Sequence, residues 1–309
     1  MIPAAAELAV YTLERQHRLL RTWVDDATLL AAFTKQHDEV DVLLATDLAI
    51  ATARAERFAP GRPAESMLNR WLPAGDLHAM FSMRFEGLDP TKPFVDATPM
   101  TRSPRTEDLT ALAATALDAY GIHRPRYLRL WSAEPRIRGT HPDRRFLSAP
   151  ISELQPHDVP AGLALRPAAK VDHYDEAQTA YDAMDADHPA HAGQAALQDR
   201  DDLQEAADVG LLFDVTVDGE WAGYVSATLD SGDTAGLPTY VVQELILTPA
   251  HRGHGYGPHL TALLAQALPD KTRLLTGTIH AANTGARSAA LKAGRHDIGG
   301  WVQLPLGGV

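Results

Sequence analysis

The sequence predicts an α/β protein built from two domains of similar construction. Its 309 residues, 45% of them hydrophobic, are enough to bury two cores. Near the midpoint, residues 151–162 (ISELQPHDVPAG) carry two prolines and a glycine, which is typical of a linker and predicts domains at 1–152 and 153–309. A partial repeat supports this division: TALAATAL at 110–117 resembles TALLAQAL at 261–268, and each stretch follows a predicted strand.

The second half alternates between strand and helix patterns. Asp218-Gly219 is a turn pair typical of a tight β-hairpin, and the apolar run at 239–249 predicts a central strand. Pro258 suits the first turn of a helix, and Asn283 and Gly294 suit the two ends of another. The predicted strands are 163–168, the hairpin 211–229, 239–249, 273–280 and 301–306, and the predicted helices are 172–184, 195–210, 257–268 and 283–294.

The first half shows similar elements in a similar order. Helical patterns occur within 12–36, around 40–70 and at 107–121, and strand patterns at 77–85, 93–100 and 126–134. Each half therefore predicts a sheet flanked by helices.

Composition excludes several classes of protein. The chain has no cysteine, so disulfides, thiolate metal sites and an acyl-cysteine intermediate are excluded. No apolar run approaches the length of a membrane span, and the N-terminal residues lack the pattern of a secretory signal. We therefore expect a cytoplasmic protein that has no membrane partner.

The net charge of −12 is unevenly distributed. Residues 1–150 hold 19 basic and 19 acidic residues, whereas residues 151–309 hold 9 basic and 21 acidic ones. Eleven of those carboxylates lie between Asp172 and Asp208, against the single Arg200. A nucleic-acid partner would need clustered Lys and Arg, so it is excluded. The acidic segment either keeps the protein soluble or attracts a cationic partner.

A glycine-rich stretch, HRGHGYGPHL at 251–260, follows the predicted central strand and precedes a predicted helix. A loop of this kind presents free backbone N–H groups and the positive end of a helix dipole, and so favours an anion, most often a phosphate. The sequence lacks the Gly-Lys-Ser/Thr of the nucleotide P-loop. Pro258 stands where the dinucleotide fingerprint needs its third glycine.

The pattern R-x-x-G-x-G from Arg252 to Gly257 does fit one family. Here the chain resembles the GNAT acetyltransferase superfamily, whose pyrophosphate loop for acetyl-CoA carries this motif between a central strand and a helix. The resemblance covers about residues 161–309 and includes the order of elements and the helix from Asn283 to Gly294. It implies two tandem GNAT-like domains, each with a mixed, mostly antiparallel sheet flanked by helices.

The resemblance also implies roles for residues, with acetyl-CoA as co-substrate. Arg252 would shape the loop, and Asn283 would bind the pantetheine arm, although Asn283 also suits an ordinary helix cap. Backbone N–H groups of Gly253, His254, Gly255, Tyr256 and Gly257, followed by Pro258, would form the pyrophosphate site. The backbone of Leu245, Ile246 and Leu247 would pair with the pantetheine and polarise the thioester carbonyl.

Acyl transfer to an amine needs a base, since a free alkylammonium has a pKa of about 10.4. Glu244 interrupts the apolar central strand and is the candidate base; the alternative is a carboxylate that points to solvent. The resemblance implies a glutamate at Thr278 and a tyrosine acid at Ala290, and this chain has neither. Tyr240, Tyr256 or water would then protonate the leaving thiolate, or no acid is needed because a thiolate leaves readily. We expect direct transfer in a ternary complex.

The matching loop of the first half, MTRSPRTE at 100–107, has no glycine, and Pro104 lacks an N–H donor. We therefore expect a first half that has lost CoA binding. The loop DADHPAH at 185–191 has no second ligand group nearby in sequence, so a solvated loop is preferred to a metal site and no metal is expected.

The acceptor is expected to be a small molecule with an amine, and a cationic one because the acidic segment falls where the resemblance places the acceptor. The alternative functions are a non-catalytic acyl-CoA-binding or regulatory protein and a structural scaffold, which would leave the glycine loop without a purpose.

Overall fold

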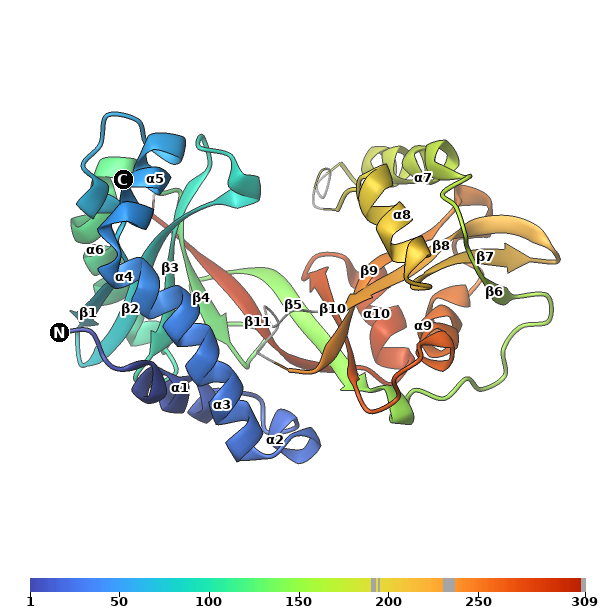
Figure 1. The fold of residues 1–309 in the computed structure, drawn as a ribbon, viewed down its shortest axis with the longest axis horizontal. Coiled ribbons are helices and arrows are strands. Elements are labelled where there is room, and N and C mark those ends of the chain that lie inside the picture. Colours follow the sequence, from blue (N-terminus) through green and yellow to red (C-terminus); the bar gives the residue numbers. More distant parts are fainter. Residues whose placement is uncertain (190–192, 194, 230–236, 307–309) are drawn as a thin grey trace. The chain divides into compact units, whose positions relative to one another are not determined.

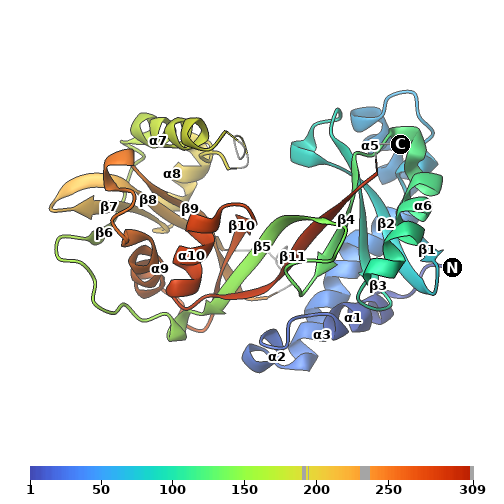
Figure 2. The same ribbon diagram turned by 180° about the vertical axis from the view of Figure 1, so that it is seen from behind.

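The computed structural model divides the chain into two compact units. Unit 1 comprises residues 1–145 and 298–309, and unit 2 comprises residues 146–297. The structure describes residues 1–189, 193, 195–229 and 237–306. Each unit contains a mixed β-sheet flanked by helices, as Figure 1 and, from behind, Figure 2 show.

In unit 1 the strand order is β1-β2-β3-β4-β11. Neighbouring strands are antiparallel except β3 and β4, which are parallel. Short 3-10 helices lie at 64–67, 86–88, 106–108 and 121–123, and a π-helical turn at 37–42. The remaining elements are α1 (Ala5–Glu14), α2 (Leu20–Trp23), α3 (Asp26–Gln36), α4 (Leu43–Thr46), α5 (Leu48–Phe58), β1 (Arg70–Ala74), β2 (Leu77–Phe85), β3 (Pro93–Met100), α6 (Leu109–Tyr120), β4 (Tyr127–Ser132) and β11 (His296–Pro305).

The core of unit 1 lies between its sheet and the helices α5 and α6. Leu112, Ala116 and Tyr120 of α6 are fully buried against β2, β3 and β4. Helix α1 covers the other face of the sheet, where Tyr11 stacks on Trp71 of β1 with 5.9 Å between ring centroids. The apolar positions of α6 therefore fix it to one face, as expected for an amphipathic helix.

In unit 2 the strand order is β5-β10-β9-β8-β7-β6. The pairs β6/β7, β7/β8 and β8/β9 are antiparallel, and β9 and β10 are parallel. Short 3-10 helices lie at 151–153 and 249–251. The other elements are β5 (His141–Pro150), β6 (Ala164–Pro167), α7 (Tyr174–Asp187), α8 (Arg200–Asp208), β7 (Leu212–Val217), β8 (Glu220–Leu229), β9 (Thr239–Leu247), α9 (Tyr256–Ala267), β10 (Leu274–His280) and α10 (Thr284–Lys292).

The helices of unit 2 lie on both faces of its sheet (Figure 1). Helices α7 and α8 pack on one face, where Ala177 and Leu203 are fully buried beside Tyr224 of β8. Helix α9 packs on the other face, where Leu260 and Leu264 are fully buried, and α10 packs beside it. The face to which a β9 side chain points therefore decides whether it contacts α7 and α8 or α9 and α10.

The predicted fold class is confirmed, since both units have a mixed, mostly antiparallel sheet flanked by helices. The repeat is visible in the topology: β1-β2-β3-α6-β4 and β7-β8-β9-α9-β10 have the same order and the same strand directions. The hairpin turn at Asp218-Gly219 is present, with positive φ at both residues.

The division between the units differs from the boundary expected at 152/153. It falls within β5 and again within β11, two strands that the sequence patterns did not fully reveal. The expected linker at 151–162 belongs to unit 2, where Ile151 and Leu154 are buried and the Ile151 N–H donates to the Arg273 carbonyl. Its prolines and glycine form a loop within unit 2 and do not mark the boundary.

Candidate active site

The strands β9 and β10 pair over only part of their length. Their recorded pairing runs from Thr239↔Leu274 to Val241↔Thr276, although β9 continues to Leu247 and β10 to His280. Beyond Val241 the described edge of β9 that faces β10 has no partner strand in this register. This opening leaves the edge of β9 at residues 245–247 accessible to an extended ligand.

A β-bulge lies at the start of the same opening. The register with β8 shifts between Ser226↔Glu244 and Ala227↔Val242, so Gln243 is an extra residue in β9. A bulge of this kind turns the following side chains to the other face of the sheet. Val242 consequently packs in the cluster with α9, whereas Glu244 points to α7.

The glycine loop joins β9 to α9 in a conformation that requires glycine. Gly253 and Gly255 have φ values of 78° and 82°, where a side chain would strain the backbone. An added Cβ at either position would meet no heavy atom within 4 Å, and both residues are exposed. Helix α9 then begins without a side-chain cap, so its first N–H groups are available to a ligand.

Gly257 has a different task from Gly253 and Gly255. A Cβ at Gly257 would lie 2.9 Å from the Cβ of Ala289, so this glycine lets α9 approach α10 closely. Pro258 follows in the first turn of α9, where its missing N–H costs no intrahelical hydrogen bond. The loop and the start of α9 are therefore shaped both by conformation and by packing.

Arg252 holds the loop in place through backbone contacts. Its Nε donates to the Leu247 carbonyl at 2.9 Å, and its Nη2 donates to the Ala180 carbonyl of α7. Burial lowers the pKa of this guanidinium. The side chain thus ties the end of β9 to α7, which is a shaping role of the kind expected from the motif.

Glu244 is a buried carboxylate, so the alternative of a solvent-directed side chain is excluded. It is 1% exposed. The hydroxyl of Tyr181 donates to its Oε2 at 2.5 Å, and the N–H of Gln198 donates to its Oε1 at 2.9 Å. Burial raises the pKa of Glu244 to about 7, even though both hydrogen bonds act to lower it. A carboxyl group with this pKa can accept and release a proton near neutral pH.

The partners of Glu244 come from elements that the sequence patterns did not connect to it. Tyr181 lies on α7, where burial and the neighbouring Glu244 raise the pKa of its phenol. Tyr174, also on α7, donates to the Gln198 carbonyl at 3.2 Å. The spacing of Tyr174, Ala177 and Tyr181 along one face of α7 was the available sequence signal, but it equally fits ordinary core packing.

Tyr240 lies in a different environment from Glu244. It is 2% exposed within the cluster that packs on α9, and the Arg273 guanidinium lies 5.6 Å from its ring centroid. His254 and Tyr256 of the loop stack on each other, with 5.8 Å between ring centroids. The structure thus brings Tyr240 and Glu244 into one strand but not into one site.

Asn283 begins α10, and its side chain accepts a hydrogen bond from the Ala286 N–H at 3.0 Å. The helix-cap role expected of Asn283 is therefore present. Thr278 is exposed on β10, and Ala290 is fully buried in α10. Neither of these two residues can donate or accept a proton as a carboxyl or phenol would.

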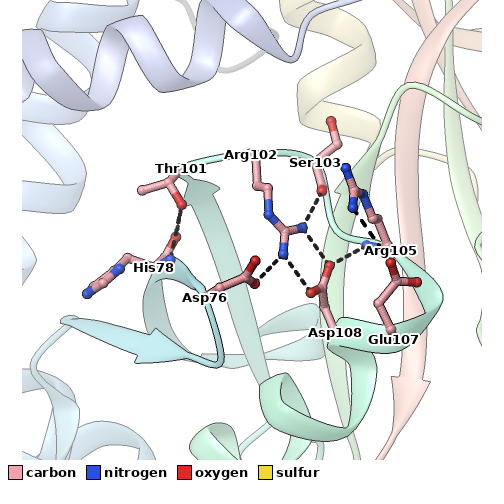
Figure 3. Close-up of polar contacts among 8 residues, drawn as sticks. All are labelled: Asp76, His78, Thr101, Arg102, Ser103, Arg105, Glu107 and Asp108. Atoms are coloured by element: carbon pink, nitrogen blue, oxygen red, sulfur yellow. Dashed lines mark hydrogen bonds and ion pairs between the residues drawn. The ribbon is translucent and has the colours of Figure 1, made fainter.

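The corresponding loop of unit 1 carries its own anion. Figure 3 shows Arg102 with both Asp76 and Asp108, and the Arg105 N–H pointing to the same Asp108 carboxylate. The two guanidinium–Asp108 hydrogen bonds are 2.7 Å each, and the Arg105 N–H lies 2.7 Å from Oδ2. Asp108 is 6% exposed, and Arg102 lowers its pKa. The Asp108 carboxylate thus accepts from the Arg105 N–H before α6, whereas no side chain caps the glycine loop before α9.

The described part of the chain was compared with two kinds of feature, a metal site and a membrane-spanning helix. Among the residues that the structure describes, no group of three metal-ligating side chains is close enough to hold an ion. Residues 190 and 191 of the DADHPAH loop lie outside the described residues. Within the described ranges no helix has the length and apolar character to span a bilayer.

Comparison with known families identifies the C-terminal part. Residues 174–294 match the model of the acetyltransferase (GNAT) family. This segment is therefore a GNAT domain, and the family transfers acyl groups from acetyl-CoA. The match includes α7, the glycine loop and α10, and thus every element of the site described above. The search of curated proteins found no match.

Several solved structures are similar to the chain at low identity. A GCN5-related N-acetyltransferase from Sphaerobacter thermophilus is 16% identical with a TM-score of 0.47, over 87% of this chain and 93% of that one. Another from Kribbella flavida is 16% identical with a TM-score of 0.45, over 85% and 97%. A tandem GNAT protein from the clavulanic acid biosynthesis pathway is 16% identical with a TM-score of 0.38, over 87% and 97%. Similarities at this level do not identify an acceptor or a mechanism.

Proposed function

We propose that the protein is an acetyl-CoA-dependent N-acetyltransferase, whose unit 2 transfers the acyl group directly to the amine of a small acceptor. The observation that carries the proposal is the coincidence of three features in one GNAT domain. An uncapped helix follows a glycine loop of positive φ, the strand before that loop has an unpaired edge, and a buried carboxyl with a pKa near 7 lies on the same strand.

The binding half of the site is formed by backbone. The N–H groups of residues 253–257 would hold the pyrophosphate at the positive end of α9. Gly253 and Gly255 allow the positive φ values that this loop conformation requires. The free edge of β9 at residues 245–247 would pair with the pantetheine arm. Asn283, whose Oδ1 caps α10, has its amide group to offer the same arm.

The chemical half of the site is Glu244. Acetyl-CoA would supply the acyl group as an activated thioester. In the reaction a C–N bond forms, the C–S bond breaks, the amine loses a proton and the sulfur leaves as a thiolate. Glu244 would accept the amine proton, directly or through one water, while Tyr181 and Gln198 hold the carboxylate in position. Because Tyr240 is buried among aliphatic side chains, we assign reprotonation of the thiolate to solvent or to the protonated Glu244.

The Glu244→Gln variant tests this assignment. Loss of a general base should lower kcat by about 10²- to 10⁴-fold, while the affinity for acetyl-CoA stays within a factor of about two. Steady-state kinetics and isothermal titration measure the two quantities. Loss of CoA affinity together with activity would show that Glu244 is needed for the fold of the site instead.

The stability of the same variant provides its control. The folded pKa of Glu244, about 7, lies above its ordinary value of 4.5, so the carboxyl favours the folded state below pH 4.5 and loses that contribution as the pH rises through 7. A neutral glutamine side chain at this position avoids the loss. The Tm of the variant should therefore equal or exceed that of the wild type at pH 8.

A non-catalytic acyl-CoA-binding protein is the second candidate, favoured by the absence of titratable groups at Thr278 and Ala290. In that case the wild type would bind acetyl-CoA but release no CoA with any amine. The Glu244→Gln variant would then behave like the wild type in every assay.

We further propose that the acceptor is cationic. Helices α7 and α8 carry most of the acidic excess and cover the sheet face to which Glu244 points. Asp182, Asp185 and Asp187 lie on the last turns of α7, beyond Tyr181. Their carboxylates would raise the local concentration of an amine cation.

Neutralising these three residues to Asn should raise KM for a cationic amine several-fold at low salt, with kcat little changed, because the charges act on encounter. Neutralising Glu153, Asp158 and Glu220 makes the same change in net charge at exposed positions of unit 2 and serves as the control. Equal KM values in both triple variants would discard the cationic acceptor.

A further inference from the structure

Arg295 is a buried arginine that the proposed reaction does not use. It follows α10, where its N–H donates to the Ala290 carbonyl at 3.0 Å, and it is 4% exposed. Burial lowers the pKa of its guanidinium to about 10, so the group remains charged at neutral pH.

The guanidinium lies against Gly277 of β10, on the face of the sheet where Val242 packs and beside the closed end of the β9/β10 opening. A Cβ at Gly277 would be 2.4 Å from Nη1 of Arg295 and 3.6 Å from the Cβ of Val242. Val242 and Gly277 are the first residues beyond the last pair, Val241↔Thr276. The absence of a side chain at position 277 thus leaves the space that the Arg295 head group occupies.

Within the described residues, no acidic side chain forms an ion pair with Arg295. Its Nε and Nη1 have no hydrogen-bond partner among the residues that the structure describes. The nearby Asp297 is paired with Arg287 at 3.4 Å, and Glu244 is held by Tyr181 and Gln198 on the α7 side. Arg252, in contrast, donates to two backbone carbonyls. Since an unpaired buried charge is costly, the position of Arg295 indicates an anionic partner that arrives with a ligand.

We propose that Arg295 binds a carboxylate of one of the two reactants at the closed end of the β9/β10 opening. The guanidinium is planar and charged, and its Nε and Nη1 can each donate to a carboxylate oxygen. The inference rests on the proposed function, which places the acyl thioester in this opening. The carboxylate is carried either by the acyl group, as in succinyl-CoA, or by the acceptor, as in an amino acid.

The first experiment is titration calorimetry of wild type and Arg295→Gln with CoA, acetyl-CoA and succinyl-CoA. Arg273→Gln is the matched control, because Arg273 lies at the start of β10 in the same unit and is already paired with Asp270. If the acyl group carries the carboxylate, the wild type and the control bind succinyl-CoA about tenfold more tightly than acetyl-CoA. Arg295→Gln loses that preference and keeps its affinity for acetyl-CoA.

The second experiment tests the acceptor as the source. Turnover with acetyl-CoA is compared for lysine and for cadaverine, which is the same diamine without the carboxylate. If the acceptor carries the carboxylate, KM for lysine in the wild type is about tenfold lower than for cadaverine, and Arg295→Gln removes the difference. The proposal is overturned if neither the acyl nor the acceptor preference depends on Arg295.

A third measurement separates this proposal from the proposed function. The dianion succinate should raise the Tm of the wild type more than that of Arg295→Gln, even if no thioester binds. Absence of acetyl-CoA binding in the wild type would refute the proposed function alone. A Tm of Arg295→Gln well below that of the wild type without ligand would show a structural role and overturn the assignment of Arg295 to a ligand.

Discussion

At the scale of single residues, Glu244 decides the chemistry. Its side chain reaches the α7 face only because Gln243 forms a bulge, and there burial raises its pKa while Tyr181 and Gln198 moderate the rise. The base must be ionised to accept a proton. We therefore expect kcat/KM to rise with pH and to level off above an apparent pKa of about 7.

Tyr181→Phe offers a specific test of this environment. Its hydroxyl donates to the carboxylate and so lowers the pKa of Glu244, and removal of the hydroxyl should move the acidic limb of the pH profile to higher pH. Tyr174→Phe is the matched control, because Tyr174 lies on the same helix and contacts the Gln198 carbonyl but not Glu244. An acidic limb that is the same in all three proteins would contradict Glu244 as the titrating base.

Residue types in the sequence predicted the loop better than the base. The motif R-x-x-G-x-G places its glycines at 255 and 257. Gly255 has the positive φ that requires glycine, whereas Gly257 is helical and is required by its contact with Ala289. The burial of Glu244 depends on Tyr181 and Gln198, which are distant in sequence. No local pattern could specify these contacts, because they arise from the packing of α7 on the sheet.

At the scale of elements, the packing of α9 against α10 positions both the loop and Asn283. Gly257→Ala would place a Cβ 2.9 Å from Ala289, so we expect a loss of about 1–3 kcal/mol in the free energy of unfolding. Ala289→Gly removes the opposing Cβ. The double variant should therefore be more stable than the sum of the two single changes predicts.

Denaturant unfolding of the wild type, both single variants and the double variant measures this coupling. Strict additivity would mean that α9 and α10 are not in contact at this point. It would also remove the packing reason for Gly257, and leave only its place in the motif.

Elements with clear start and stop signals in the sequence were predicted closely. The strands expected at 77–85 and 93–100 agree with β2 and β3, and the helix expected at 283–294 contains α10 between its Asn and Gly ends. Strands β1 and β5 were not predicted, and β11 begins earlier than expected. Their sequences, such as HPDRRFLSAP in β5, mix charged residues and prolines with apolar ones, so pairing with neighbouring strands decides their conformation.

At the scale of the whole molecule, the two units share a topology but differ at the loop before the equivalent helix. The loop of unit 2 offers free backbone N–H groups. In unit 1 the Asp108 carboxylate accepts hydrogen bonds from Arg102 and from the Arg105 N–H (Figure 3). We therefore propose that only unit 2 binds acetyl-CoA. The repeat was visible in the sequence, but the way in which Asp108 replaces an external anion required the structure.

The stoichiometry of acetyl-CoA binding in isothermal titration shows whether unit 2 alone binds the co-substrate. We expect one site per chain, lost in Gly255→Glu and retained in Gly61→Glu. Gly61 is a matched control because it has the same φ of 82° and equally open surroundings, but lies in unit 1. Two sites per chain would contradict the proposal that Asp108 blocks the loop of unit 1. Binding that survives Gly255→Glu would contradict the assignment of the glycine loop as the pyrophosphate site.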